Sequence, residues 1–397
     1  MKGLFALALL SSTALAAPAI DYHVDGQTVL SKQPGFSLDL TEQRLVLLEG
    51  DATPRRVSEL EKIHLKAQGI NFFDVTETPD LSAYAANLQR ERQALPKPNA
   101  TDLVRPIIKT LSTDGPKANL AKFTSFRTRY YRSDTGKQSQ QWLLSRISEI
   151  TDEFAPDALR DLITFKEFPH SWGQNSIIVR IEGSTKPDEV VIVSAHQDST
   201  NMWPFLPAPG AFNAVLWWDD GSGTVTILEA YRGLIAAGFQ PDRTVEFHWY
   251  SAEEGGLLGS QAVAKDYAAK QANVIASSQF DMTAWVKRGT REEVGIITDF
   301  VDEEVSNFNK VLVDLYLDIP YVETQCGYAC SDHASWTQAG YPSSFTIEST
   351  FQNSNKNIHS TNDRSDISDE FSFEHILEFS KLATAFAVEL GGWSKKQ

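Results

Sequence analysis

Five short segments of this 397-residue chain carry histidine or carboxylate side chains that could do chemistry. They are His196-Gln197-Asp198, Asp219-Asp220, Glu253-Glu254, Gln279-Phe280-Asp281 and Asn357-Ile358-His359. Four of the five end an apolar run or directly follow one, which is typical of the carboxyl end of a buried strand. Any one of them alone is also explained by a helix cap or a structural polar group.

Together, these residues form a donor set suited to a metal-dependent hydrolytic site. Imidazole and carboxylate ligands suit divalent ions such as zinc, and a shared carboxylate can hold two ions roughly 3.5–4 Å apart. In the glutamate pair, one side chain can bind metal while its neighbour acts as a general base. Asp198 lies two residues after His196, so in extended backbone it points to the same side and can orient the imidazole. The only cysteines, Cys326 and Cys330, exclude a zinc site of four thiolates.

The chain around these motifs alternates between strand and helix patterns. Strands are predicted at 177–181, 190–195, 244–250, 272–280, 295–297 and 344–347, and helices at 138–153, 222–236, 256–269 and 373–386. This alternation predicts an α/β fold, a single α/β/α sandwich with a mixed, largely parallel central sheet. Ligands of such sheets bind beyond the carboxyl ends of the strands, where most of the motifs stand.

The amino terminus predicts an exported protein. Lys2 precedes the apolar run 4–10, and small-x-small cleavage signals follow, so residues 1–19 are predicted to be a signal peptide. No later stretch reaches about 18 uncharged apolar residues, so we expect no membrane span. The formal net charge of −16 disfavours nucleic acid as a partner. We therefore expect a secreted, extracellular protein, and we expect a monomer.

Residues 20–90 contain short apolar runs but no chemical motif. They end in the charged, proline-containing stretch 88–98, which is typical of an exposed linker open to proteolysis. This pattern fits either a cleavable propeptide or a small N-terminal subdomain that stays attached. Asn99 begins the only Asn-x-Ser/Thr sequon, so it is a candidate glycosylation site in an exported protein.

The motifs, in this order and spacing, resemble those of the co-catalytic two-zinc leucine aminopeptidases, which are secreted fungal enzymes with extracellular bacterial relatives. Gly221-Ser222-Gly223, the segment from Cys326 to His333, and Ser360-Thr361 extend the resemblance. It covers the chain from about residue 100 onwards, and residues 20–90 resemble the cleaved propeptide of the fungal members. It implies a catalytic domain at 91–397, with the propeptide acting as an inhibitor or folding aid.

The resemblance implies two Zn²⁺ per chain. Asp219 would bridge the two ions, and the peptide bond that follows it would be cis. His196 and Asp281 would complete one zinc site. Glu254 and His359 would complete the other.

The resemblance also assigns the residues around the ions. Glu253 would be the general base, Asp198 would orient His196, and Tyr328 would donate to the oxyanion. Cys326 and Cys330 are expected to form a local disulfide in the exported protein, shaping the site. The residues that match the apolar pocket for the first side chain are Met282, Phe345, Ile347, Phe351 and Ile358.

The implied reaction removes an unblocked N-terminal residue, preferably leucine or another apolar residue, from peptides. Rival hypotheses are a metallo-carboxypeptidase or deacylase, a one-zinc glutaminyl cyclase, and a non-catalytic peptide-binding protein on a peptidase fold. The motifs contain no arginine or lysine to clamp a terminal carboxylate, and all five ligand candidates and the base are present. Both observations favour the aminopeptidase.

One stretch departs from the family pattern. Between Ala208-Pro209-Gly210 and Asp219, the family has a short acidic stretch, but this chain has the apolar residues 211–218. We expect this insertion to affect the geometry of Asp219 rather than its identity. The other histidines are expected to be structural: His23, His64, His170, His248, His333 and His375.

Overall fold

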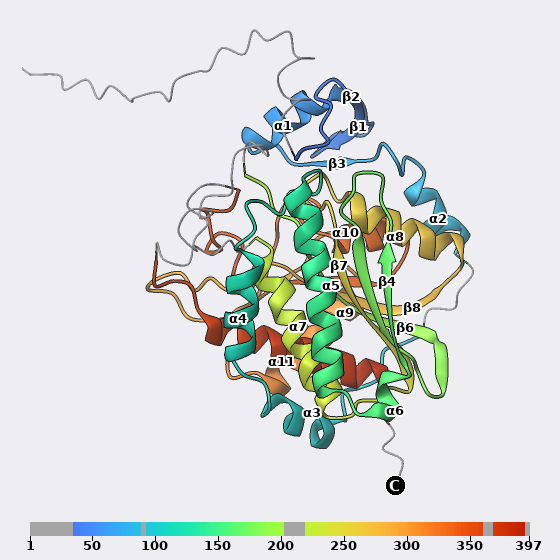
Figure 1. The fold of residues 1–397 in the computed structure, drawn as a ribbon, viewed down its shortest axis with the longest axis vertical. Helices are drawn as coiled ribbons and strands as arrows, with labels where there is room; N and C mark the ends of the chain where they lie inside the picture. Colours follow the sequence, from blue (N-terminus) through green and yellow to red (C-terminus); the bar gives the residue numbers. More distant parts are fainter. Residues whose placement is uncertain (1–34, 89–92, 202–218, 360–367, 394–397) are drawn as a thin grey trace, which may run out of the picture.

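A computed structural model of the chain describes residues 35–88, 93–201, 219–359 and 368–393. Its central sheet has eight strands in the order β10-β9-β11-β8-β6-β7-β5-β4. Figure 1 labels β4, β6, β7 and β8 of this sheet. In chain order the eight strands are β4 (Ile163–Phe168), β5 (Ser176–Ile181), β6 (Lys186–His196), β7 (Arg243–Tyr250), β8 (Asn273–Phe280), β9 (Val294–Ile297), β10 (Tyr321–Thr324) and β11 (Ser343–Ile347). Six of them match the predicted strands, while β4 and β10 were not predicted.

The sheet is mixed: its central strands pair in parallel, and so do β9 and β10 at one edge. β6 pairs in parallel with β7 and β8, and β11 pairs in parallel with β8. β5 pairs in antiparallel fashion with β4 on one side and with β7 on the other, and β9 and β11 are also antiparallel. Successive residues of β6 pack into different cores, with Val191 and Val193 on one face and Val190 and Ile192 on the other. Burial on both faces explains why this strand reads as a continuous apolar run.

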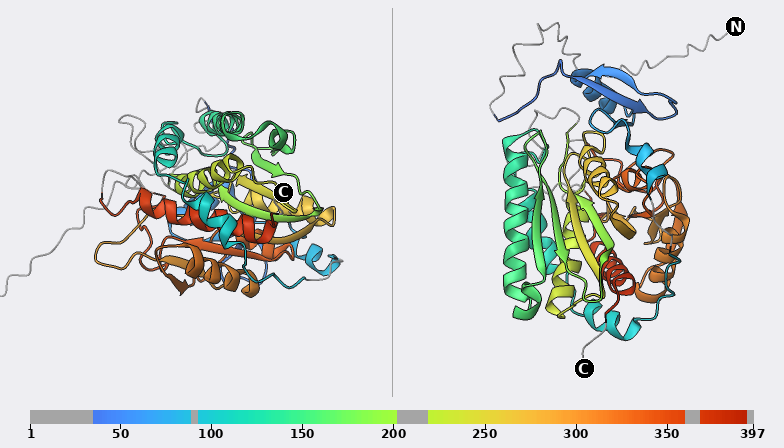
Figure 2. Two further views of the ribbon diagram at one scale, coloured as in Figure 1. Left: turned by 90° about the horizontal axis from the view of Figure 1, so that it is seen from below. Right: turned by 90° about the vertical axis from the view of Figure 1, so that its right-hand side faces the viewer.

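Helices cover both faces of the sheet, so the predicted three-layer fold is confirmed (Figure 2). The larger core contains residues of α3 (Thr101–Ile108), α4 (Asp114–Phe123), α5 (Asp134–Phe154), α6 (Asp157–Arg160), α7 (Gly221–Ala236), α9 (Glu303–Tyr316) and α11 (Phe373–Gly391). The smaller core on the other face contains residues of α8 (Leu258–Ala269) and α10 (His333–Gln338). None of the helices in the described ranges is both long enough and apolar enough to span a bilayer.

The predicted helices follow from local sequence rules. In α5, Leu143, Ile147 and Ile150 are buried at i, i+4 and i+7, and Ser133 caps the helix by accepting the N–H of Gly136. In α11, whose residues are buried on most sides, the Ser372 hydroxyl accepts the N–H of His375 in the same way.

A smaller unit precedes the sandwich. It contains β1 (Gln43–Leu48), β2 (Arg55–Ser58), α1 (Glu59–Ala67), β3 (Phe72–Asp74) and α2 (Leu81–Asn87). The three strands form an antiparallel sheet in the order β2-β1-β3. Figure 2 shows this unit seated on one end of the sandwich, opposite the end from which the C-terminus leaves. The predicted signal peptide at 1–19 and the apolar insertion at 211–218 lie outside the described residues.

Candidate metal centre

The order of the strands brings the predicted site residues to one edge of the sheet. β6, β7 and β8 are adjacent and parallel, so their carboxyl ends meet there. β6 ends at His196, the glutamate pair that begins at Glu253 follows β7, and Asp281 follows β8 directly. Asp219 lies two residues before the start of α7, and His359 lies in the loop after β11. These five positions are separated in the sequence but share one end of the sandwich.

Asp219 lies between two histidine–carboxylate pairs. Its Oδ1 is 3.4 Å from Nε2 of His196, and its Oδ2 is 3.0 Å from Nε2 of His359. The same nitrogen of His196 is 3.6 Å from Oδ1 of Asp281, and that of His359 is 3.0 Å from Oε2 of Glu254. The two oxygens of Asp219 therefore face two separate groups of ligand-type atoms, which is the arrangement expected of a bridging carboxylate.

The chemistry of these residues fits bound zinc. His196 is fully buried, yet neither ring nitrogen has a well-formed hydrogen bond among the described residues, and the same holds for Oδ1 of Asp281. Buried polar atoms normally have a hydrogen-bond partner, so the unpaired nitrogen and oxygen atoms indicate that a bound group is their partner. Imidazole nitrogens and carboxylate oxygens are the usual non-thiolate ligands of zinc. Two groups have their ligand atoms within 4.8 Å of one another: His196 with Asp220 and Asp281, and Asp219 with Glu254 and His359.

Asp220 belongs to the first of these groups, but its oxygens already bind backbone donors. Oδ1 accepts the N–H of Gly223 at 2.6 Å and that of Met282 at 3.3 Å. Oδ2 accepts the N–H of His196 at 3.3 Å. Asp220 therefore caps α7 and ties it to the ends of β6 and β8. The peptide bond between Asp219 and Asp220 is cis, as the resemblance implied.

Burial and neighbouring charges shift the pKa values of the side chains in this cluster. Burial opposes ionisation of Asp219, but the neighbouring imidazoles of His196 and His359 outweigh that effect and lower its pKa. Burial lowers the pKa of His359, but the Glu254 carboxylate and the hydrogen bond to Asp219 raise it to about 10. For Glu253, burial and the adjacent carboxylate of Glu254 raise the pKa, against the opposing effect of His196. A carboxylate with a raised pKa is suited to accepting and returning a proton near neutral pH.

An apolar pocket adjoins the polar cluster, in a cavity of about 690 Å³ that includes space open to solvent. All five residues predicted for the pocket line this cavity, and they pack in one apolar cluster. Ile297 and Val301, which were not predicted, join the same cluster. Ile297 ends a predicted strand, but nothing in the sequence places that strand beside the pocket.

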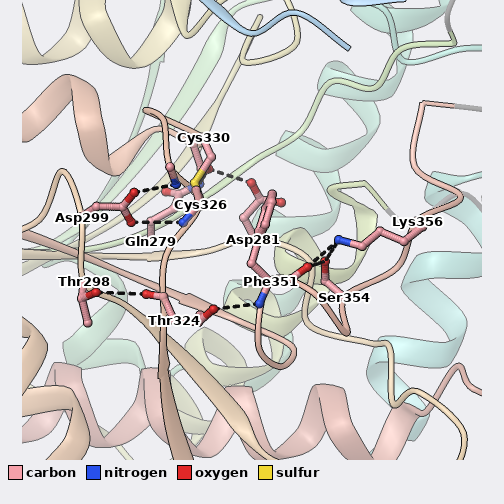
Figure 3. The surroundings of a disulfide bond; sticks show 12 residues. Gln279, Asp281, Thr298, Asp299, Thr324, Cys326, Cys330, Phe351, Ser354 and Lys356 are labelled. Carbon is pink, nitrogen blue, oxygen red and sulfur yellow. Dashed lines mark hydrogen bonds between the residues drawn. A yellow bond between two sulfur atoms is a disulfide. The ribbon is translucent and has the colours of Figure 1, made fainter. Parts of the chain in front are cut away.

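The predicted disulfide between Cys326 and Cys330 is present and packs against the apolar pocket. Asp299 holds the loop by accepting the N–H of Cys326 at 3.1 Å and that of Gly327 at 2.7 Å. Figure 3 shows Asp299 beside Cys326. Directly after the loop, the Ser331 hydroxyl donates to Oδ2 of Asp281 at 2.7 Å. The disulfide loop is therefore tied to one of the candidate ligands.

Tyr328 projects from the disulfide loop and lines the same cavity as Glu253. Its ring packs edge-on against Phe351, with centroids 6.2 Å apart and planes at 77°. Burial raises the pKa of Tyr328, and the nearby Glu253 carboxylate adds to this effect. The phenol therefore keeps its proton at neutral pH and can act as a hydrogen-bond donor.

The N-terminal unit supplies a residue that sequence reasoning missed. Lys66 at the end of α1 donates from Nζ to the backbone oxygen of Glu254 at 2.9 Å, and it also binds that residue's Oε2. Ile70, Asn71 and Phe72 line the cavity beside it. In the sequence, Lys66 is one of several charged residues of an ordinary amphipathic helix, so no local signal marks it.

The glycosylation candidate and, among the described residues, the histidines expected to be structural lie outside the ligand cluster. Asn99 is exposed, as a glycosylation site requires. Of the histidines expected to be structural, His248 lies between Glu246 and the hydroxyl of Tyr250 at 3.0 Å each. His333 is also buried, and His23 lies outside the described residues.

Comparisons with known proteins agree on one family. The sequence pattern of peptidase family M28 matches residues 176–383. Leucine aminopeptidase 1 of Pyrenophora tritici-repentis is 44% identical over 97% of both chains, and that of Coccidioides posadasii is 44% identical over 97% of this chain and 98% of its own. The crystal structure of the Legionella pneumophila LapA aminopeptidase covers 89% of this chain and 99% of its own, with a TM-score of 0.75 and 25% identity.

Proposed function

The chain belongs to peptidase family M28 and is a zinc-dependent aminopeptidase, and from this premise we propose its substrates, ligands and catalytic residues. The substrate is a peptide with a free N-terminus, preferably leucine or another apolar residue. The preference rests on the apolar residues that line the cavity beside the ligand cluster. An apolar pocket selects by size and shape, by about 10–200-fold for one methylene.

The placement of Asp219 between His196 and His359 carries the proposal of a two-zinc site. Asp219 would bridge the ions, with His196 and Asp281 on one side and Glu254 and His359 on the other. When bound, the zinc ions supply Lewis acidity, which polarises the scissile carbonyl and lowers the pKa of water.

Side chains of this chain would perform the proton transfers and the orientation. Glu253 accepts a proton from the attacking water and delivers it to the leaving amine. The Tyr328 hydroxyl donates a hydrogen bond to the oxygen on which negative charge develops. Asp198, whose Oδ1 lies 3.3 Å from Nδ1 of His196, holds that imidazole in orientation.

Release of p-nitroaniline from leucine p-nitroanilide tests this function. We expect chelator-sensitive activity that returns when zinc is restored, and a Glu253→Gln variant that folds, binds zinc and loses about 10²–10⁴-fold in kcat. Full activity of the Glu253→Gln variant would exclude Glu253 as the base. Release of C-terminal residues or acyl groups instead of the N-terminal leucine would favour the rival hydrolases.

We further infer that the chain is exported with a signal peptide at 1–19 and carries a propeptide at 20–90. The N-terminal unit packs over the ligand cluster, since Lys66 contacts Glu254. Residues 93–98 between the unit and the sandwich are mostly exposed and have no regular structure, as a cleavage region requires. Culture medium analysed by N-terminal sequencing and mass spectrometry tests the export, the cleavage and the glycosylation at Asn99. Gel filtration tests the expected monomer.

A further inference from the structure

The last turn of α1 presents Lys66 to one half of the ligand cluster. Its ammonium binds both the backbone oxygen of Glu254, at 2.9 Å, and the Oε2 carboxylate oxygen. That oxygen is the one that lies 3.0 Å from Nε2 of His359. The ammonium therefore binds Glu254 on the same oxygen that faces His359.

The other carboxylate oxygen of Glu254 is already engaged. Oε1 accepts the backbone N–H of Thr200 at 3.2 Å. Oε2 is the oxygen that faces His359, so an ammonium and a metal ion at the second zinc position would compete for it. Two cations held a few ångströms apart in a buried place repel strongly. No lysine or arginine in the described ranges makes a comparable contact with His196 or Asp281, the ligand candidates of the other half.

The position of α1 does not depend on Lys66. Lys62, one turn earlier, is buried and binds Asp74 at 3.0 Å and Glu59 at 2.9 Å. Arg44 of β1 binds the same Asp74 oxygen at 2.8 Å. This network ties α1 to the small sheet, and the capping box between Ser58 and Glu61 fixes the start of the helix.

We propose that Lys66 occupies the second zinc position of the uncleaved chain, so that this form holds zinc only at His196 and Asp281 until the N-terminal unit leaves. The inference rests on the proposed two-zinc site and adds the way in which the propeptide controls it. The N-terminal unit would then limit zinc binding to the site as well as substrate access to it.

The number of zinc ions per uncleaved chain tests this proposal directly. The full exported chain, its intact mass verified, is equilibrated with excess zinc, separated from free metal and analysed for zinc. We expect one zinc per chain for the wild type, and two for Lys66→Met and for the wild type after removal of the N-terminal unit. Lys66→Met keeps the length of the side chain and removes the charge.

Lys265→Met is the matched control. Lys265 binds Asp80 at 2.7 Å and the backbone oxygen of Glu77 at 3.4 Å, so it links the sandwich to the N-terminal unit without touching a ligand candidate. This variant should hold one zinc, as the wild type does. Two zinc ions in the control would show that loosening the N-terminal unit is enough to let the second zinc bind. That result would overturn the proposal that Lys66 excludes this ion.

The remaining outcomes separate this inference from the proposed function. Two zinc ions in the uncleaved wild type, or one in a folded Lys66→Met variant, would overturn the inference while leaving the two-zinc enzyme in place. If Lys66→Met does not fold, the number of zinc ions bound by the wild type before and after cleavage tests the inference. One zinc in the cleaved chain would overturn the inference together with the proposed two-zinc site.

Discussion

The carboxylate of Asp198 accepts the backbone N–H of Glu253 at 3.0 Å. Its other oxygen accepts the N–H of Glu254 at 3.2 Å, and Oδ1 also lies 3.3 Å from the imidazole of His196. One buried carboxylate thus positions a proposed ligand and the loop that carries both the proposed base and a second ligand.

The first prediction concerns Asp198→Asn. An amide keeps one acceptor oxygen and places an NH₂ group where the second N–H now binds, so one backbone donor loses its partner. We expect zinc affinity and kcat each to fall about 10–100-fold, the range typical of groups that hold metal ligands. Zinc titration of the metal-free, cleaved chain and steady-state kinetics measure the two effects. Unchanged zinc affinity would show that Asp198 does not position His196.

The second prediction concerns Gly223 in the first turn of α7. A Cβ there would lie 2.1 Å from the backbone oxygen of Phe280 and within 2.5 Å of both carboxylate oxygens of Asp220. Gly223→Ala should therefore push Asp220 away from the strand ends, lower zinc affinity and destabilise the fold by about 1–3 kcal/mol. Denaturant unfolding and zinc titration measure both changes. In Gly289→Ala the added methyl meets nothing within 4 Å, so this control should keep its zinc affinity, and any loss of stability would come from its φ of +80°.

The third prediction concerns stability in acid. The buried ring of His333 stacks on Phe345, and burial lowers its pKa to about 3. In the unfolded chain a histidine takes up its proton near pH 6.5, so between about pH 6.5 and 3 unfolding binds one extra proton. This uptake makes stability fall with decreasing pH by up to about 1.4 kcal/mol per unit.

The measurement compares wild type with His333→Phe by urea unfolding from pH 8 to 4. In acid, the free energy of unfolding of the variant should fall less steeply with pH, by the contribution of one proton. Above pH 7.5 neither the folded nor the unfolded state binds that proton, so the curves of wild type and variant should run parallel. His333→Gln should show the same change of slope whatever its stability at pH 8. Identical acid slopes in all three proteins would contradict a buried, neutral His333.

The fourth prediction concerns the choice of substrate. Phe351 lines the cavity and packs edge-on against Tyr328, so Phe351→Ala enlarges the pocket and removes contacts to a bulky side chain. We expect the ratio of kcat/KM for leucine over alanine p-nitroanilide to fall about 10-fold. Phe300→Ala is the control, because Phe300 is 50% exposed and lines a neighbouring cavity. An unchanged ratio in Phe351→Ala would remove Phe351 from the pocket.

Local sequence rules were enough to predict the sandwich and the general place of the site. The apolar run 190–195 predicts a strand buried on both faces, and the position of His196 at its end predicts a side chain at the edge of the sheet. Strand and helix preferences depend on neighbours a few residues away, so they can be read along the chain. The order of the motifs was sufficient to indicate the aminopeptidase family, because it records which residues follow which strands.

Contacts between distant segments depended on the tertiary structure alone. Lys66 meets Glu254 across 188 positions, and Ile297 joins the pocket through the pairing of β9 with β11. The same holds for the two-sided hydrogen bonding of Asp198, whose partners come from the loop after another strand. Such contacts arise from the packing of elements on one another, and no period or spacing in the sequence encodes them. The sequence therefore determined which groups could do the chemistry, and packing decided which other groups hold, cover and compete with them.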